Sequence, residues 1–318
     1  MLIVTNFTHF PARWQSADGH CGETAVASTL NQFLVHRRRR DAVFLIDCNP
    51  RLVMALVALR PVRRAPVIAV DLVLRRPTSR LSHPVKRFLL ARADRYIHYF
   101  KDWQGIEAVY GIPSQRSTFV PFKPNLAFVG PTAPAPDGNY VLCFGRSLRD
   151  FDSFFAAIET LPFPAAIPYP DFDHLAAHGA RFTRRLDRLP ANLTLLEDDG
   201  SPAAQERILR GAKLVVLPVL KSSIVASGIS TALNAMRLGK CVIGSDGPGM
   251  SDIFAETAMI VPAEDPAALA AAIRRGWEDD ALRRRTAEAG FRHASALGGE
   301  AELHRRIIDR VVAWYPTI

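Results

Sequence analysis

The sequence has few cysteines and no long run of apolar residues. Its four cysteines lie far apart, with no C-x-x-C pair and no paired histidines at metal-ligand spacing, so neither a disulfide framework nor a zinc site is indicated. The longest apolar runs, such as Leu52 to Leu59, are much shorter than the ~20 residues that span a bilayer. The first residues lack the basic-then-apolar order of a signal peptide. We therefore expect a cytoplasmic protein with free thiols.

The sequence also lacks two common nucleotide-binding signatures. It contains neither a Walker G-x-x-x-x-G-K-[ST] sequence nor a G-x-G-x-x-G sequence, which argues against P-loop and ordinary dinucleotide-binding proteins. Apolar residues make up 48% of the chain and charged residues 22%, as in ordinary folded proteins. At 318 residues the chain exceeds the size of one hydrophobic core, so we expect two domains.

Positive charge is concentrated in the first part of the chain. Residues 1–130 contain 19 Lys and Arg against 8 Asp and Glu, a net charge of +11, whereas the remainder contains 21 against 23, a net charge of −2. The arginines cluster at Arg37 to Arg40, Arg60 to Arg64 and Arg75 to Arg80. Such clusters suit anionic lipid headgroups or nucleic-acid phosphates, and a merely solvated surface is an equal alternative for any single cluster.

The first part of the chain reads as apolar strands alternating with helices. Strands are expected at 2–7, 42–47, 65–71 and 95–100, and helices at 23–35 and 84–93. Continuous apolar strands separated by helices predict a parallel sheet covered on both faces, and ligands of such sheets bind at the carboxyl ends of the strands. Asp47, Asp71 and His98 stand at those ends.

A proline-rich stretch divides the chain. Pro121 to Gly138 contains five prolines and two glycines, which favours a linker over a regular element. A second alternating set of strands and helices follows, ending in a helix around Glu300 to Trp314. We predict an α/β protein with two Rossmann-like, doubly wound parallel-sheet domains facing a cleft: domains 1–125 and 126–300, with a C-terminal helix at 301–318 packing back toward the first.

Two glycine turns in the second domain indicate an anion site. Ser227 and Gly228 precede a helix that begins near Ile229 or Ser230, where unpaired amides and the positive end of the helix dipole favour a phosphate. The sequence "FGRSLRD" ends another strand of the same sheet and supplies Gly145, Arg146 and Arg149, whose guanidinium groups match phosphate oxygens. The alternative is an ordinary N-cap serine and turn glycine.

These motifs occur in an order that resembles the donor domain of GT-B glycosyltransferases, particularly family four (group 1). The strand ending in Gly145-Arg146, the strand "VVLP" ending at Pro218, the segment "NAMRLGKCVIGSD" from Asn234 and the turn "GPGMSDIF" match that pattern. The segments "VPAEDPAALAAAIRRGWEDDALRRR" and "YGIPSQRSTFVPFKPN" resemble flanking parts of the family. Together the likeness covers roughly two thirds of the chain.

The resemblance implies a nucleotide-sugar donor whose diphosphate lies against Arg146 and the amides near Gly228. Two departures stand out: the paired glutamates of the family fall near Ala226 and Asn234, and its phosphate lysine is absent. Asn234 is then expected at the ribose, Asp252 or Glu197 as a replacement carboxylate, and Arg149 or Lys221 as a replacement cation. The expected donor-site residues are Gly145, Arg146, Arg149, Glu197, Lys221, Ser227, Gly228, Ile229, Ser230, Thr231 and Asn234.

The resemblance further implies transfer without a metal or cofactor and with retained anomeric configuration, and it makes 1–125 the acceptor-binding and 126–300 the donor-binding domain. Asp71 is the first candidate for a catalytic or acceptor-orienting carboxylate and His98 the second, each with a helix cap or satisfied buried polar group as its structural alternative. Asp18 and His20 are weaker candidates.

The leading interpretation is a hexosyltransferase-like enzyme that glycosylates an acceptor hydroxyl in bacterial glycan or glycolipid synthesis, with its basic domain against the inner face of an anionic membrane. The missing glutamates leave open a catalytically inactive sugar-nucleotide-binding module. A sugar-nucleotide epimerase on the same scaffold is a further alternative. The basic clusters lack interleaved aromatic residues, so nucleic acid is not expected as a partner.

Overall fold

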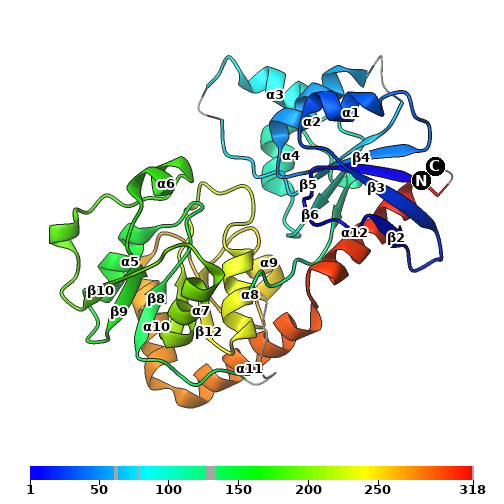
Figure 1. The fold of residues 1–318 in the computed structure, drawn as a ribbon. Helices are drawn as coiled ribbons and strands as arrows, with labels where there is room; N and C mark the ends of the chain where they lie inside the picture. Colours follow the sequence, from blue (N-terminus) through cyan, green and yellow to red (C-terminus); the bar gives the residue numbers. More distant parts are fainter. Residues whose placement is uncertain (61–63, 78, 127–133, 317–318) are drawn as a thin grey trace. The chain divides into compact units, whose positions relative to one another are not determined.

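The computed structural model describes residues 1–60, 64–77, 79–126 and 134–316 (Figure 1). The chain forms two compact units, which are Met1–Pro121 with Glu300–Ile318, and Phe122–Gly299. The sequence placed the corresponding boundaries after residues 125 and 300. Part of the predicted linker and of two arginine clusters, namely residues 61–63, 78 and 127–133, lies outside the described residues.

Unit 1 is built on a seven-stranded sheet with the order β2-β3-β1-β4-β5-β6-β7. All neighbouring strands are parallel except the edge pair β2 and β3. The central strands are buried along their whole length because helices cover both faces. The strands are β1 Leu2–Thr5, β2 Arg13–Gln15, β3 Cys21–Val26, β4 Ala42–Asp47, β5 Val67–Val70, β6 Arg95–His98 and β7 Ser117–Phe119.

The helix predicted at 23–35 is wrong in its first half. Cys21–Val26 is strand β3, and only Leu30–Val35 is helical, as α1. β3 alternates between more and less exposed residues and pairs with β1 on one side and β2 on the other. These inter-strand hydrogen bonds outweigh the apolar spacing of the sequence, because a six-residue strand followed by a short helix can show the same spacing as one longer helix.

The helices of unit 1 are α1, α2 Pro50–Ala58, α3 His83–Leu90, α4 Gln104–Tyr110 and the C-terminal α12 Glu300–Trp314. α12 belongs to this unit although 178 residues of the other unit precede it in the chain. It packs against β2, and the buried ring of His304 lies 4.7 Å from the Phe10 ring, centroid to centroid. None of the described helices is both long enough and apolar enough to cross a membrane.

Unit 2 contains a wholly parallel six-stranded sheet with the order β10-β9-β8-β11-β12-β13. The strands are β8 Tyr140–Cys143, β9 Ala165–Pro168, β10 Leu193–Leu196, β11 Ala212–Leu217, β12 Cys241–Ser245 and β13 Met259–Val261. The helices are α5 Phe151–Ile158, α6 Phe172–Ala177, α7 Pro202–Gly211, α8 Ile229–Arg237, α9 Ser251–Phe254, α10 Pro266–Glu278 and α11 Asp280–Ala296. The two parallel sheets confirm the predicted fold class.

Strand adjacency determines which loops meet. In unit 1, β4, β5 and β6 are neighbours, so Asp47, Asp71 and His98 share one edge of the sheet. In unit 2, β8 lies between β9 and β11, so the loops that follow these strands share an edge as well. Each edge is the carboxyl end of a parallel sheet, where open α/β folds bind their ligands.

Candidate functional site

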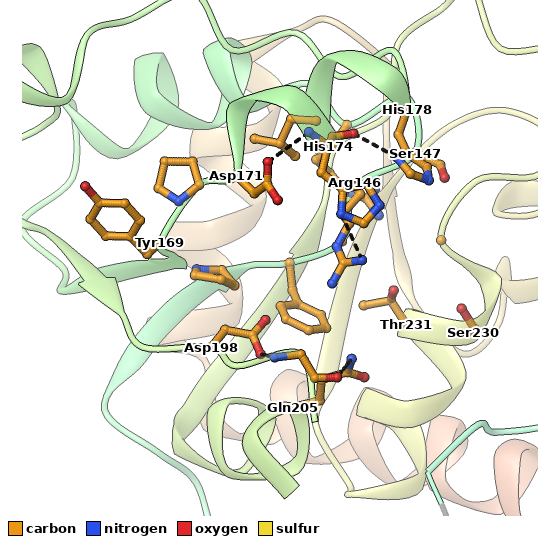
Figure 2. Close-up of a pocket in the computed structure, with 18 of the residues that line it drawn as sticks. Arg146, Ser147, Tyr169, Asp171, His174, His178, Asp198, Gln205, Ser230 and Thr231 are labelled. Atoms are coloured by element: carbon orange, nitrogen blue, oxygen red, sulfur yellow. Dashed lines mark hydrogen bonds between the residues drawn. The ribbon is translucent and has the colours of Figure 1, made fainter. Parts of the chain in front are cut away.

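A cavity of about 680 Å³ opens at the carboxyl edge of the unit 2 sheet, which is a usual size for a small-molecule site. Figure 2 shows Tyr169 and Asp198 at one end, Ser230 and Thr231 at the other, and Arg146 between them. The lining comes from four loops and three helices: Phe144, Gly145, Arg146, Ser147 and Arg149; Tyr169, Asp171, His174 and His178; Asp198, Asp199, Gly200 and Gln205; Gly228, Ser230, Thr231 and Asn234.

The backbone around Arg149 is held between two neighbouring segments. The amide of Asp150 donates to the Pro218 carbonyl at 2.9 Å, and the amide of Leu220 donates to the Leu148 carbonyl at 3.0 Å. On the other side, the amide of Arg181 donates to the Arg149 carbonyl at 2.8 Å. The loop after β8 is therefore fixed on both flanks, and the position of the Arg149 side chain is fixed with it.

The Arg149 guanidinium is buried, and no carboxylate among the described residues pairs with it. The side chain is 1% exposed, Nη1 donates to the Pro218 carbonyl at 3.4 Å, and Nε has no acceptor among the described residues. The adjacent Asp150 does not compensate the charge, because Arg181 and Ser153 already bond its carboxylate. Burial lowers the pKa of Arg149, but arginine stays charged because its ordinary value is far above neutrality. Such a buried charge is costly unless an anion joins it.

Two glycines bring the backbone against this guanidinium. Gly145 and Gly228 have φ of +99° and +97°, conformations that favour glycine. A Cβ at Gly145 would clash with Nη2 of Arg149, and a Cβ at Gly228 would lie 3.0 Å from the same atom. Both residues line the cavity. Their missing side chains leave the Nη2 end of Arg149 accessible from the cavity between two turns of backbone.

Helix α8 begins at the cavity, as the sequence predicted. Gly228 is its N-cap and makes no side-chain hydrogen bond to the first turn, and the first intrahelical bond of this turn runs from the Ala232 amide to the Gly228 carbonyl at 2.8 Å. The preceding amides of the helix have no intrahelical acceptor. Ser230 and Thr231 line the cavity, whereas Ser227 and Ile229 are buried beside it. The positive end of the α8 dipole therefore faces the cavity.

A histidine of α6, His174, and the histidine at the C-cap of this helix, His178, lie near Arg146 (Figure 2). Arg146 Nη1 donates to His174 Nδ1 at 3.5 Å, and His178 Nδ1 donates to the His174 carbonyl at 2.7 Å. Asp171, the N-cap of α6, accepts from the His174 amide at 2.9 Å. Sequence reasoning missed these residues, although they follow strand β9 and the rule for strand ends could have found them.

Other expected donor residues lie elsewhere. Glu197 is exposed outside the cavity, and its place in the lining is taken by Asp198 and Asp199. Lys221 is exposed and lines a separate small depression with Asp246. Asp252 accepts from the Gly249 amide at 2.6 Å, which caps a turn. Among the described residues, no three His, Cys, Asp or Glu side chains are grouped as a metal site.

Asn234 lies at the cavity but has a structural task. Its Oδ1 accepts from the amides of Asn125 and Leu126, at 2.7 and 3.1 Å. The side chain is 4% exposed, and it ties the start of unit 2 to helix α8. An acceptor oxygen used in this way is not available to a ribose hydroxyl, so only the amide nitrogen of Asn234 can face a ligand.

Unit 1 holds a second cluster, at the ends of β4 and β5. The Cys48 sulfur lies within hydrogen-bond distance of the carboxylates of Asp47 and Asp71, at 3.5 and 3.7 Å, and its one proton can be donated to either. Cys48 and Asp71 have positive φ, of 47° and 44°. Desolvation raises the pKa of Asp71 to about 7, with repulsion from Asp47 as a further cause, and desolvation raises that of Asp47 to about 6. These carboxyl groups are poised to hold a proton near neutral pH.

His98 is packed inside unit 1. It is 4% exposed, its Nδ1 donates to the Phe100 carbonyl, and its ring stacks on Trp103 with centroids 4.3 Å apart. This placement favours its structural alternative, a satisfied buried polar group, over contact with a substrate. A catalytic role for Asp71 stays a prediction.

Comparison with known sequences supports the resemblance drawn from the motifs. Residues 190–293 match the family model of glycosyl transferases group 1. This segment runs from β10 through α11 and includes Gly228 and helix α8. No match was found among curated proteins.

Solved structures with the same fold are GT-B glycosyltransferases. Sucrose-phosphate synthase from Thermosynechococcus elongatus is similar with a TM-score of 0.69 and 17% identity, over 100% of this chain and 89% of that one. Anabaena HepE in complex with UDP-glucose gives 0.63 and 13%, over 98% and 99%. A glycosyltransferase from Rickettsia africae gives 0.64 and 11%, over 87% and 77%. The protein therefore has the GT-B fold.

Replacing both carboxyl groups, in Asp47→Asn/Asp71→Asn, should alter how stability depends on pH. A raised pKa in the folded state means that the stabilisation is complete below the unfolded value near 3.8 and is lost as pH rises through about 6 and about 7. Between pH 4 and 7 the wild type should lose about 1–3 kcal/mol relative to the variant. Urea unfolding at a series of pH values measures this difference. Asp18→Asn, at an exposed aspartate, should reproduce the wild-type curve.

Gly145→Ala should destabilise the protein and displace Arg149. The substitution combines an unfavourable positive φ with a clash against the guanidinium, so we expect a loss of about 2–4 kcal/mol in the free energy of unfolding. Gly19→Ala is the matched control, because Gly19 has φ of +85° and nothing lies within 4 Å of its would-be Cβ. That control should cost only about 1–2 kcal/mol. Equal losses in the two variants would contradict the placement of Arg149.

Proposed function

We propose that this protein is a glycosyltransferase that transfers a sugar from a nucleoside-diphosphate sugar to an acceptor hydroxyl. The observation that carries the proposal is the Arg149 guanidinium, which is buried at the edge of a cavity and has no counter-ion in the described part of the chain. Arg146 and the first turn of α8 line the same cavity. A pyrophosphate supplies the negative charge that these groups lack. The family match over residues 190–293 and the GT-B fold support the same conclusion.

Arg149, Arg146 and the first turn of α8 contribute differently to anion binding. Arg149 is already desolvated, so an anion that reaches it gains a strong interaction without a further cost of burying the cation. Arg146 lies at the cavity surface and offers a planar fork for phosphate oxygens. The amides of α8 add hydrogen bonds with a fixed direction. Each charge-assisted hydrogen bond contributes about 1.5–3 kcal/mol.

The same groups fit the chemistry of glycosyl transfer. As the bond between the anomeric carbon and the phosphate oxygen breaks, its electron pair stays on the nucleoside diphosphate, whose charge becomes more negative. Cations and amides placed before the reaction stabilise that charge most in the transition state. We propose that arginine and helix amides do this without a metal. Retention of anomeric configuration is proposed from the family resemblance, and NMR of the product can test it.

Asp71 is proposed as the residue that orients the acceptor hydroxyl. Its pKa of about 7 would let the carboxyl group accept a proton from that hydroxyl near neutral pH. The basic charge of unit 1 suits an acceptor carried by an anionic lipid, and synthesis of a bacterial glycan or glycolipid is the proposed setting.

A binding module without turnover is the second candidate. It is favoured by Asn234, which stands where the resembled family has a glutamate and uses its oxygen to bond the chain at residues 125–126. Such a module would bind the nucleotide sugar as tightly as an enzyme does, but it would not cleave the bond between the sugar and the diphosphate. Detection of free nucleoside diphosphate during incubation with nucleotide sugars and candidate acceptors separates the two.

Arg149→Met should stabilise the free protein and abolish donor binding. Removing a buried charge without a partner should raise the free energy of unfolding by about 1–3 kcal/mol, while loss of the pyrophosphate contact should weaken binding at least about 100-fold. Thermal shift against UDP, GDP, ADP and CDP finds the nucleotide, and calorimetry with that diphosphate and its monophosphate gives the affinities. The diphosphate should bind wild type more tightly than the monophosphate.

Arg188→Met is the control, because Arg188 is an exposed arginine of the same unit outside the cavity. It should change neither the free energy of unfolding nor the affinity. A stable Arg149→Met variant that binds the diphosphate like wild type would contradict the proposed site. Binding by wild type that Arg149→Met abolishes, with no sugar released under any condition, would favour the binding module.

A further inference from the structure

Exposed apolar side chains are concentrated in unit 1. Of the eight large apolar side chains that stand exposed among the described residues, six belong to this unit and two to unit 2. Three of the six belong to one helix and the turn before it: Leu81 is 90% exposed, Val85 59% and Phe88 56%. Scattered exposed apolar residues are ordinary on soluble proteins, but a group on one helix marks an interaction surface.

Helix α3 presents these side chains on its outer face. Figure 1 shows α3 on the outside of unit 1, beside α2 and α4, against which it packs. Its inner face contains the buried Leu90 and the half-buried His83, whose Nε2 bonds the Val109 carbonyl at 2.9 Å. Val85 and Phe88 are three residues apart on α3 and share its opposite, exposed face, while Leu81 lies in the turn before the helix and Arg92 follows the helix.

Positive charge surrounds this apolar face. The segment 72–93 contains six Lys and Arg and no Asp or Glu. Arg80 and Lys86 are exposed beside the apolar side chains. The Arg92 guanidinium lies 3.4 Å from the centre of the Phe88 ring and donates to the Phe88 carbonyl at 3.1 Å. An apolar face with a basic border, with arginine stacked along an aromatic ring, is typical of a helix that lies in a membrane interface.

We propose that the exposed face of α3 with its flanking turns, formed by Leu81, Val85, Phe88 and Arg92 together with Arg80 and Lys86, docks unit 1 onto a bilayer that contains anionic lipids. The apolar side chains enter the headgroup region and the basic side chains pair with lipid phosphates. The face is called the α3 patch below. This inference goes beyond the proposed function and does not depend on the identity of the donor.

Charge and apolarity together favour a bilayer over the other partners. A second copy of the same patch would bring two strongly positive surfaces together, which is repulsive. A nucleic-acid backbone would use the basic side chains but would leave Leu81 and Val85 in water, and the patch offers only Phe88 for base stacking. An anionic bilayer is complementary to both components of the patch.

Vesicle co-sedimentation of the full chain at physiological ionic strength tests the proposal. Vesicles of neutral phosphatidylcholine are compared with vesicles that also contain phosphatidylglycerol, without any nucleotide present. Wild type should bind the anionic vesicles at least about tenfold more tightly, since each Lys or Arg near such a surface contributes roughly fivefold. Leu81→Ser/Val85→Ser/Phe88→Ser and Arg80→Gln/Lys86→Gln should each weaken that binding about tenfold or more.

Two controls in the same unit separate the α3 patch from general charge and general apolarity. Arg38→Gln/Arg40→Gln removes the same charge at exposed arginines outside the patch, and Val35→Ser removes an apolar side chain that is 76% exposed. Both should bind anionic vesicles within about threefold of wild type. Circular dichroism and thermal unfolding of every variant verify that the fold is intact.

Each contrary outcome overturns the proposal in a distinct way. Equal binding of wild type to both kinds of vesicle, or binding to neither, excludes docking on an anionic bilayer. If the Leu81→Ser/Val85→Ser/Phe88→Ser variant binds anionic vesicles like wild type, the apolar side chains do not contribute. Binding then depends on charge alone, as binding to a soluble polyanion would. Equal losses in the Arg38→Gln/Arg40→Gln and Arg80→Gln/Lys86→Gln variants exclude a defined patch. A wild-type dimer that the serine variant converts to monomer, without vesicle binding, assigns the face to a second copy. None of these results bears on donor binding.

Discussion

The buried charge of Arg149 is the constraint on which the rest of the proposed donor site depends. An arginine that is 1% exposed and has no carboxylate partner among the residues described lowers the stability of the free protein, and the fold retains it between two strand-end segments and two glycines. The nearby acid that could have compensated it, Asp150, is bonded by Arg181 and Ser153 instead. The result is a site that is prepared for an anion before any ligand arrives.

Much of the fold and the centre of the site could be predicted because the signals were local. Apolar strands that end in glycine or aspartate identified the carboxyl edges of both sheets, and Gly145, Arg146, Arg149 and Gly228 line one cavity, as the sequence suggested. Positive φ at both glycines explains why glycine stands there. The helix predicted at 23–35 was wrong in its first half because local sequence patterns do not report strand pairing. The pairing of β3 with β1 and β2 depends on residues outside the segment itself.

The remaining features of the site required tertiary information. Nothing in "FGRSLRD" distinguishes the surface Arg146 from the buried Arg149, since only the packing against Pro218 and the two glycines does so. Asn234 was assigned to a ribose by its place in the motif, but its oxygen is used by backbone amides of a segment more than 100 residues away. Residues that contact a ligand and residues that hold the chain in place have the same sequence signature.

The absence of glutamate at position 234 is consistent with an uncompensated Arg149. A carboxylate on α8, next to Gly228, would lie in the same cavity and would offset the positive potential that the guanidinium creates. A neutral asparagine preserves that potential and still satisfies the amides of residues 125 and 126. The carboxyl groups that line the cavity, Asp171, Asp198 and Asp199, each accept a backbone amide within their own turn. Positive and negative side chains therefore lie in different parts of the cavity. The cations lie near Gly145 and Gly228, and the acids lie in the loops after β9 and β10. A ligand that carries its negative charge at one end matches this separation.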